Sequence, residues 1–410
     1  MTTAAVAAAA ASRTANIAVI GSGWWSQGWH LPHLHRNKDV KLAAIVDSST
    51  HPKSPLNPSL EPLSALSALY QAPTFLSTND LLESELGPTL DGVLVATPHA
   101  THYEIGELLL KEAKRRKEES PSDHRPMNVL MEKPMTTNVH EAKGMLDLVQ
   151  SYQDDGGKGC FLINHSANYR EQCKVARQLI VSGAIGGIRH VTCFMASPLS
   201  FIFDDPANTG WNEPSDSSML GNGFSWGQCS HLLAWIFHVC PNLLPHHVFC
   251  VMNESKITGA DVSHSASVIC SDVCGTNDVI LSMSGTSMLP GNVHSDPAVG
   301  KILRIQIFGT EGSILYGGND DQDPSSGQLE LRRVANNGNV ELPCGPGFYF
   351  ESLSQEGTGP ESLQSFIDAC LGKQNYYVGA DAAVGLRTVQ ILEAMYRSNA
   401  SRKLEDVLYS

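Results

Sequence analysis

The first half of the chain alternates short apolar runs with stretches of helical periodicity. Five runs are rich in Val, Ile and Leu, at residues 16–21, 41–47, 91–97, 128–132 and 160–164. They lack the apolar–polar alternation of a strand with one wet face, which is typical of parallel strands buried on both faces. Strands that alternate with helices in this way predict a doubly wound, parallel α/β sheet.

Two capping boxes indicate where helices begin between these runs. Thr101 stands three residues before Glu104, and Asn138 stands three residues before Glu141. In each pair the first side chain can accept a hydrogen bond from a free backbone N–H of the first helical turn. We therefore expect one helix to follow Thr101 and another to follow Asn138.

Two further segments of the first half look inserted. Residues 51–62 contain four prolines, and residues 111–126 lengthen a helix with mixed charges before a Ser-Pro step. Proline removes a backbone donor and fixes φ, so the first segment can be neither regular helix nor central strand. We expect both to be surface excursions without a chemical role.

After about residue 165 the pattern changes to one helix followed by a series of strands. The helix is expected at 171–182, and the strand-like runs lie at 188–196, 247–253, 265–270, 279–284 and 303–308. Another helix around 231–239 is expected against one face of this sheet, and a last helix at 382–398. This order predicts an α+β domain with a large open, mostly antiparallel sheet. The expected division is a disordered tail at 1–14, a first domain at 15–165 and a second at 166–410.

The composition excludes several classes of protein. With 42% apolar residues the chain can bury a large core, which excludes disorder throughout. The 28 basic and 42 acidic side chains give a net charge of −14. An acidic surface repels phosphate backbones, so we expect no nucleic-acid partner. No apolar run approaches the roughly 20 residues of a membrane-spanning helix, so no membrane partner is expected either.

The ten cysteines and the N-terminus bear on the compartment. The first 159 residues hold no cysteine, which argues against a disulfide framework, and Cys270 and Cys274 are too isolated to indicate a zinc site. We expect reduced thiols, no metal and a cytoplasmic location. The Ala-rich start predicts a disordered tail, and an organelle-targeting segment is the weaker alternative.

A glycine-rich turn follows the first predicted strand directly. Gly21 and Gly23 begin a GxGxxG-like motif that continues through Trp24 and Trp25 and has Ser26 in the third glycine position. The first glycine permits the tight turn, and the second allows a pyrophosphate to approach the backbone. The helix that follows would direct its free N–H groups at the phosphates. This turn predicts a dinucleotide site.

The end of the second predicted strand bears on which dinucleotide binds. Asp47 stands there, and no arginine follows it closely. A carboxylate at this place can accept both ribose hydroxyls of NAD, and it repels the 2′-phosphate of NADP. We therefore expect NAD, with NADP as the alternative.

Three more segments carry candidate chemistry. Residues 96–102 (ATPHATH) end the third strand, residues 131–134 (MEKP) end the fourth, and residues 221–231 (GNGFSWGQCSH) precede a helix of the second domain. Ligands of an open α/β sheet bind beyond the carboxyl ends of its strands. The first two segments should therefore meet the glycine-rich turn in one crevice.

These motifs, in this order, resemble the Gfo/Idh/MocA oxidoreductase family, which includes glucose–fructose oxidoreductase, inositol dehydrogenase and their relatives. The resemblance runs from residue 16 to about 398. Three further motifs carry it. They are HLPHL at residues 30–34, which follows the glycine-rich turn, SGAIGGIRHV at residues 182–191 and IFGTEGSILY at residues 307–316. It implies a Rossmann domain that binds a nicotinamide dinucleotide and a second domain that holds the substrate and often forms the subunit interface.

The resemblance also implies roles for single residues. Lys133 would lie by the nicotinamide and the substrate and assist proton transfer, and His231 matches the family's catalytic histidine. Pro134 would shape the loop, often through a cis peptide. The other residues that match or flank dinucleotide contacts are Trp24, Trp25, Thr97, Pro98, His99, His102 and Glu132. Histidine suits proton transfer near neutral pH, and a desolvated lysine can either exchange a proton or polarise a carbonyl as a cation.

The chain departs from the family pattern four residues before the histidine. The family usually has Asp there, and this chain has Gly227. Gln228 could replace a hydrogen bond but not a charge. Aromatic residues gather in the preceding loop, and because aromatic faces stack on sugar rings we expect Trp211 and Trp226, with Gln228, to contact the substrate.

The expected function is an NAD(P)-dependent oxidoreductase for a sugar-like or cyclic alcohol or ketone. The alternative, motivated by Gly227, is a catalytically inactive dinucleotide-binding regulator or sensor of the same fold. A cofactor that stays bound through alternating half-reactions is a third interpretation. A small, carbohydrate-like substrate and a homo-oligomer are the expected partners.

Overall fold

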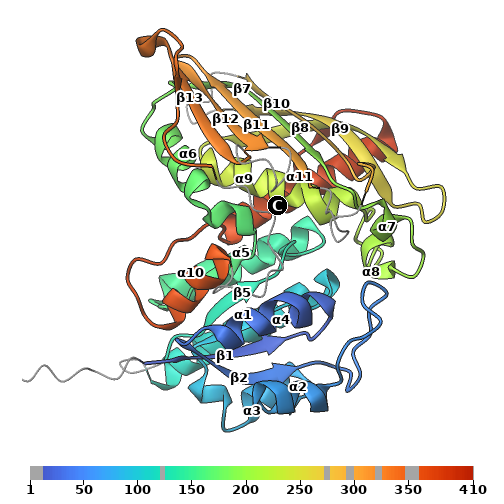
Figure 1. Ribbon diagram of the computed structural model, residues 1–410, viewed down its shortest axis with the longest axis vertical. Coiled ribbons are helices and arrows are strands. Elements are labelled where there is room, and N and C mark those ends of the chain that lie inside the picture. Colours follow the sequence, from blue (N-terminus) through green and yellow to red (C-terminus); the bar gives the residue numbers. More distant parts are fainter. Residues whose placement is uncertain are drawn as a thin grey trace, which may run out of the picture.

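The computed structural model describes residues 13–120, 125–271, 278–291, 300–318, 326–346 and 360–409. Two β-sheets form the frame, a smaller one at the N-terminal end and a larger one above it, with helices between them (Figure 1). Residues 1–12 of the expected tail lie outside the described residues.

The first sheet has six parallel strands in the order β3-β2-β1-β4-β5-β6. Their bounds are β1 Ala15–Ile20, β2 Val40–Val46, β3 Thr74–Phe75, β4 Gly92–Val95, β5 Asn128–Met131 and β6 Phe161–Ile163. All five predicted apolar runs form strands, and the prediction of a doubly wound parallel sheet is confirmed. Only the two-residue β3 carried no signal, because it is too short to show a pattern.

The helices of this domain lie on both faces of the sheet. Their bounds are α1 Leu31–Arg36, α2 Leu63–Tyr70, α3 Thr78–Glu83, α4 His102–Glu119 and α5 Val139–Asp154. The Asn138 side chain accepts from the Glu141 backbone N–H at 2.9 Å, so the predicted cap of α5 is confirmed. The predicted cap of α4 is wrong. A 3₁₀ turn, His99–Thr101, already gives Thr101 helical dihedrals, and its hydroxyl donates to the Pro98 carbonyl instead.

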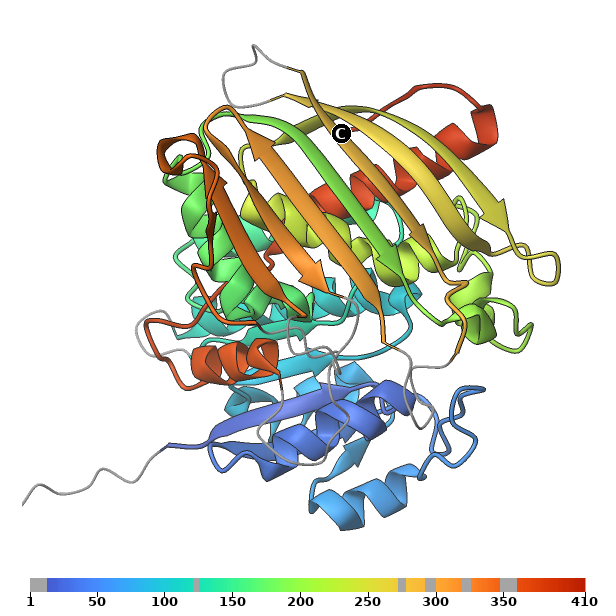
Figure 2. The same ribbon diagram turned by 45° about the horizontal axis from the view of Figure 1, so that its top comes forward.

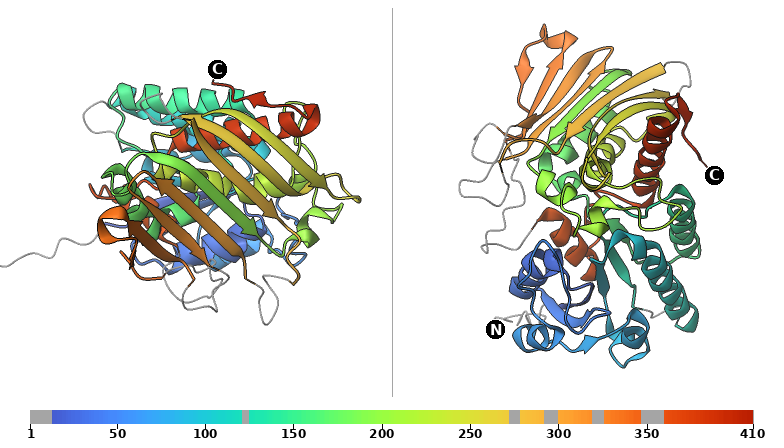
Figure 3. Two further views of the ribbon diagram at one scale, coloured as in Figure 1. Left: turned by 90° about the horizontal axis from the view of Figure 1, so that it is seen from above. Right: turned by 90° about the vertical axis from the view of Figure 1, so that its right-hand side faces the viewer.

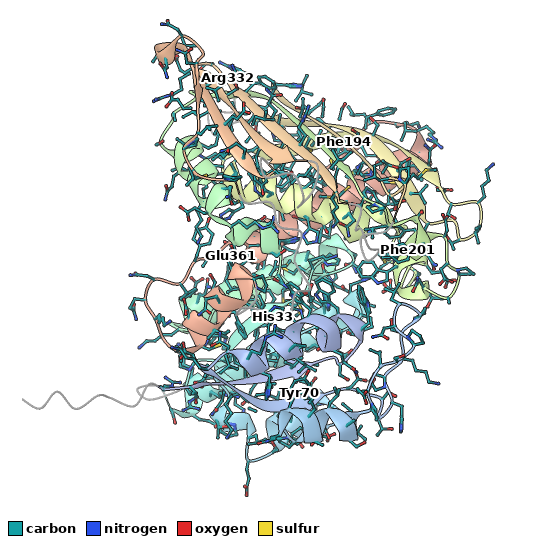
Figure 4. The ribbon with its side chains drawn as sticks, in the orientation of Figure 1. His33, Tyr70, Phe194, Phe201, Arg332 and Glu361 are labelled. Carbon is teal, nitrogen blue, oxygen red and sulfur yellow. The ribbon has the colours of Figure 1, made fainter. Side chains whose placement is uncertain are left out.

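One more helix of the first sheet comes from far along the chain. Helix α10, Glu361–Cys370, packs its Phe366 and Ile367 into the cluster that holds Leu94 and Leu130 of the sheet. Figures 1 and 4 show α10, with Glu361 at its start, beside the lower sheet. A side chain at Gly92 would come within 2.4 Å of the Cys370 sulfur, so glycine allows this close approach. The N-terminal domain is thus completed by residues near the C-terminus.

The second sheet has nine strands in the order β14-β13-β12-β11-β7-β10-β9-β8-β15. Their bounds are β7 Ile188–Ala196, β8 Leu244–Glu254, β9 Asp261–Ser271, β10 Asp278–Thr286, β11 Ile302–Gly309, β12 Gly312–Gly318, β13 Gln328–Arg333, β14 Val340–Glu341 and β15 Glu405–Asp406. The five predicted strands all form. Neighbouring strands are antiparallel except β7 and β10, which confirms the mostly antiparallel prediction.

Three helices cover the inner face of this sheet. They are α6 Glu171–Val181, α9 Ser230–Val239 and α11 Ala382–Ser401, and they separate the two sheets (Figure 2). Helix α9 is buried on nearly all sides, and its Trp235 stacks on Tyr316 of β12 with ring centroids 5.2 Å apart. The helix that holds His231 is therefore fixed by packing on every face.

The outer face of the large sheet carries no helix in the described part of the chain (Figure 3). Four large apolar side chains are exposed on it: Phe194, Phe249, Val251 and Ile280. Figure 4 shows Phe194 on this upper layer. Within the same residues, no helix is long and apolar enough to cross a bilayer. Nine cysteines fall in the described ranges, and all are free thiols, eight of them buried.

Candidate functional site

The glycine-rich turn between β1 and the next helix needs glycine at its first position. Gly21 has φ +92°, and a Cβ there would lie 2.4 Å from the Ala96 carbonyl oxygen at the end of β4. At Gly23 a Cβ would meet nothing within 4 Å. Ser26 is buried and begins a π-helical segment, Ser26–His30. The turn is thus tight on the sheet side and open at Gly23, as a pyrophosphate cradle requires.

Asp47 follows β2 and binds the same turn. One carboxylate oxygen accepts from the Ser22 backbone N–H at 2.8 Å and from its hydroxyl at 2.9 Å, and the other accepts from the Ser49 N–H. The aspartate therefore shapes the turn from the β2 side. It does not line the cavity described next.

A cavity of about 430 Å³ opens from Gly23 toward the second domain. Of the predicted site residues, it is lined by Gly23, Trp24, Trp25, Thr97, Pro98, His99, Glu132, Lys133, Trp211, Gln228 and His231. Gly21, Asp47, His102, Pro134 and Trp226 do not line it. The motifs at the ends of β1, β4 and β5 thus meet at one crevice, as predicted, with the residues before and within α9 on its other side.

Lys133 joins the two domains across this cavity. It follows β5, and its peptide bond to Pro134 is cis. Its ammonium group donates to the Gly227 carbonyl oxygen at 2.8 Å and lies 5.0 Å from the centre of the Trp211 ring. The lysine is therefore held near α9 by a hydrogen bond and by a cation–π contact.

Glu132 organises the wall next to the lysine. Its carboxylate accepts from His30 Nε2 at 2.8 Å, Asn164 Nδ2 at 2.7 Å and Trp25 Nε1 at 3.2 Å. Burial alone would raise the pKa of Glu132, but the hydrogen bond and charge of His30, the Lys133 ammonium and the Asn164 hydrogen bond outweigh it and lower the pKa to about 2. The carboxylate is thus ionised at neutral pH. It joins the end of β5 to the segment of Trp25 and His30 and to Asn164 after β6.

The two histidines after β4 are buried. His102 bonds the Pro134 carbonyl at 2.7 Å and the Thr97 carbonyl at 3.0 Å, which ties together the loops after β4 and β5. Burial is the main cause that lowers the pKa of both, and it brings the pKa of His99 to about 3. His99 lines the cavity beside Trp211, with ring centroids 5.6 Å apart.

His231 lies in the first turn of α9 and borders the cavity. Its ring meets the His165 ring edge to face, with centroids 5.3 Å apart. Burial lowers the pKa of His231 well below 6.5, and the charges of Lys133, His165, Lys301 and Arg170 lower it further. At neutral pH the imidazole is therefore uncharged and can accept a proton.

Asp261 anchors the segment that leads into α9. Its carboxylate accepts from the Ser225 backbone N–H at 2.9 Å, the Ser225 hydroxyl at 2.7 Å and the Tyr396 hydroxyl. These bonds hold the π-helical segment Ser225–Cys229 against β9 and α11. The positions of Gly227 and His231 relative to Lys133 follow from this anchor.

Aromatic rings occupy the space around Gly227, where the family pattern has an acid. A Cβ at Gly227 would lie 3.2 Å from Phe203 and 3.4 Å from Trp211. Gln228 accepts from the Lys301 ammonium at 2.7 Å. Trp211 lines the cavity, as predicted, whereas Trp226, expected to contact substrate, is 1% exposed and stacks on Tyr396 in the core. The prediction for Trp226 is therefore corrected.

Sequence reasoning missed several residues of the cavity wall. Residues 53–56 of the proline-rich segment line it, so that segment is more than a surface excursion. Gln27 holds this segment in place by hydrogen bonds to the backbone of Glu61. Arg170 and Lys301 line the second-domain side. None of these carried a motif, because their roles depend on contacts between distant segments.

Comparison with known proteins bears on the family of the first domain and on the fold. Residues 15–155 match the model of the Gfo/Idh/MocA family, described as an oxidoreductase family with an NAD-binding Rossmann fold. The resemblance seen in the motifs is thus confirmed over the first domain, whose residues 15–155 match this family. No curated protein matches the chain.

Solved structures share the whole architecture at low identity. GenD2 from gentamicin A biosynthesis, in complex with NAD, is 18% identical with a TM-score of 0.65, over 97% of each chain. Myo-inositol 2-dehydrogenase from Lactobacillus plantarum is 17% identical with a TM-score of 0.63, over 97% of this chain and 100% of its own. The WlbA dehydrogenase from Bordetella pertussis, in complex with NADH and UDP-GlcNAcA, has the same four values. At these identities the likeness shows the fold.

Proposed function

We propose that the protein is an NAD(P)-dependent oxidoreductase that acts on a sugar-like or cyclic alcohol or ketone. The observation that carries the proposal is that Lys133 and His231, from different domains, border one cavity that begins at Gly23. The match of residues 15–155 to an oxidoreductase family supports this proposal. A bound nicotinamide would supply the hydride acceptor or donor, and the protein would supply the proton chemistry and the orientation.

The residues present fit a dinucleotide along this cavity. The open space at Gly23 admits the pyrophosphate, and Trp24, Thr97, Pro98 and His99 continue the wall toward Lys133. We propose NAD as the preferred form, because the Asp47 carboxylate beside the turn would repel a 2′-phosphate. Quenching of tryptophan fluorescence in separate titrations with NADH and NADPH tests this preference, since Trp24 and Trp25 line the cavity.

The proton chemistry follows from the charge states of the two residues. Uncharged His231 can take the proton of a substrate hydroxyl during oxidation and return it during reduction. The Lys133 ammonium, held toward α9, can stabilise the negative charge that develops on the substrate oxygen. The rings of Trp211 and Phe203 provide an apolar wall on which a cyclic substrate can stack.

Turnover assays with NAD⁺ and NADH and a panel of sugars, inositols and dihydrodiols test the function. Replacing Lys133 by Met should remove nearly all activity while tryptophan quenching by NADH persists. Equal turnover by wild type and the Met variant would contradict the role of the lysine. Lys158→Met, far from the cavity lining, is the matched control.

A regulatory dinucleotide-binding protein is the second candidate, and the aromatic filling around Gly227 favours it. This function predicts NADH binding without turnover of any substrate in the panel. Measurable stereospecific hydride transfer would eliminate it.

We further propose self-association through the exposed face of the large sheet and action in the cytoplasm, where the free thiols would stay reduced. Sedimentation of the purified protein tests the self-association. Localisation of the tagged full chain in cells tests the cytoplasmic location.

A further inference from the structure

His165 follows β6 and lies directly behind His231. It is 0% exposed, and among the described residues neither of its ring nitrogens has a hydrogen-bond partner. Its chain neighbours Asn164 and Ser166 both line the cavity. A neutral imidazole carries one donor and one acceptor, so burial of this ring leaves both unused by the protein.

Such a ring is costly if it serves packing alone. A buried donor or acceptor without a partner loses its bonds to water and is not compensated. Phenylalanine would fill a similar space without that loss. The site therefore holds a group whose nitrogens the fold itself does not use, next to the residue proposed to exchange the proton.

The orientation of His231 points to what this group does. Catalytic bases are usually oriented by a third group that hydrogen-bonds them. Within the described ranges no residue hydrogen-bonds His231, and its ring contact is the edge-to-face one with His165. The His165 ring is thus an aromatic contact that helps to hold the plane of the His231 ring.

We propose that His165 is a positioning residue for the proton transfer, whose ring orients His231 and whose unused nitrogen stabilises His231 in its protonated form. The inference rests on the proposed oxidoreductase function. In alcohol oxidation the carbon–hydrogen bond gives a hydride to the nicotinamide, and the oxygen–hydrogen bond gives its proton to His231. The imidazolium that forms lies against the His165 ring, whose two nitrogens have no hydrogen-bond partner among the described residues.

The surrounding charges make this second nitrogen useful. Lys133, Lys301 and Arg170 face His231 and disfavour its protonated form, as does His165 when its own ring is charged, and Lys133 and Glu132 face His165. An acceptor of hydrogen bonds beside His231 offsets part of the repulsion by the three cations. With His165 beside it, His231 can therefore retain the proton longer than a single histidine would at this place.

His165→Phe is the decisive variant, because it keeps an aromatic ring and removes both nitrogens. We expect a raised thermal midpoint, unchanged quenching by NADH, a kcat lowered about 10-fold or more, and a KM changed far less. The limb of the kcat–pH profile that reports His231 should move to lower pH. His165→Gln, which restores an acceptor, should recover part of kcat.

Three outcomes would overturn the inference. They are a wild-type kcat and pH profile in His165→Phe, a loss of activity that follows a loss of thermal stability or NADH binding, and no difference between the Phe and Gln variants. Absence of turnover in the wild type would instead contradict the proposed function itself. Added imidazole should restore activity to His165→Gly, which a purely structural role does not predict.

Discussion

At the scale of single residues, the site depends on charged side chains whose partners are protein groups. Glu132 is the clearest case, because three donors from two segments converge on one of its carboxylate oxygens. Gly227 shows the opposite device, in which aromatic rings take up the room that a side chain would need. Both arrangements fix the surroundings of Lys133, one through hydrogen bonds and one through packing.

The first prediction concerns the acid stability contributed by Glu132. A carboxyl whose folded-state pKa is about 2, below its ordinary 4.5, stabilises the fold above pH 4.5, and this contribution is lost as the pH falls toward 2. Glu132→Gln should lower the free energy of unfolding at pH 7 by up to roughly 3 kcal/mol and flatten its dependence on pH between 4.5 and 2. Urea denaturation at several pH values measures both, and exposed Glu83→Gln should change neither.

The second prediction concerns the space around Gly227. A methyl group there must displace Phe203, so Gly227→Ala should destabilise the fold by about 1–3 kcal/mol. In a Phe203→Leu background the same change should cost less, because the ring edge nearest the methyl is gone. A double-mutant cycle by urea denaturation measures the coupling. Additive effects would contradict the packing described.

At the scale of elements, the ends of helices and strands position the chemistry. Helix α5 begins at a side-chain cap, whereas α4 continues from a 3₁₀ turn that places His99 and His102 at the cavity side of β4. Two π-helical segments precede α1 and α9. The first π-helical segment follows the glycine-rich turn and the second contains Gly227, and ligand would approach at these two places.

The third prediction separates the two capping boxes. Asn138→Ala should destabilise the protein by about 1 kcal/mol, because it removes the bond to Glu141 N–H and a second bond to the Ser218 hydroxyl. Thr101→Ala should cost less, within about 0.5 kcal/mol, since its side chain caps nothing. Asn138→Asp, which keeps the cap, is the control. Equal losses at the two sites would contradict the difference seen in the structure.

How far the sequence predicts this molecule depends on the range of the interaction. Five strands of each sheet and the turn at Gly21 follow from local pattern and motif, and the pairing of Lys133 with His231 follows from the resemblance to the family. Trp211 and Trp226 are the same residue type in one loop, yet only the fold decides that one lines the cavity and the other fills the core.

Contacts between residues that are far apart in the sequence could not be predicted, for the same reason. The packing of α10 on the first sheet and the placement of His165 beside His231 join residues whose sequences carry no mutual signal. The proline-rich segment was recognised as irregular. That its residues 53–56 would line the cavity depends on Gln27, a residue with no motif of its own.

At the scale of the whole molecule, the two domains share more than the cavity between them. Lys133 of the first domain bonds Gly227 of the second, and α10 returns from the second to the first. The unfolding of one domain should therefore destabilise the other.

The fourth prediction tests this coupling through Phe366, which is fully buried against the first sheet. Phe366→Ala should lower the free energy of unfolding by about 3–5 kcal/mol and weaken NADH binding, although the residue is not part of the cavity lining. Urea denaturation followed by tryptophan fluorescence measures the first effect, and NADH titration the second. Leu69→Ala, at an exposed position of α2, should change neither.

The late return of α10 also has a consequence for synthesis on the ribosome. The strand β6 ends at Ile163, but the helix that covers this side of its sheet begins only at Glu361. At roughly 5–20 residues per second, translation of the intervening 361 − 163 = 198 residues takes about 10–40 s. During that interval the apolar surface around Leu94 and Leu130 lacks the cover that α10 provides, so the nascent N-terminal half exposes more of it to aggregation than the finished protein does.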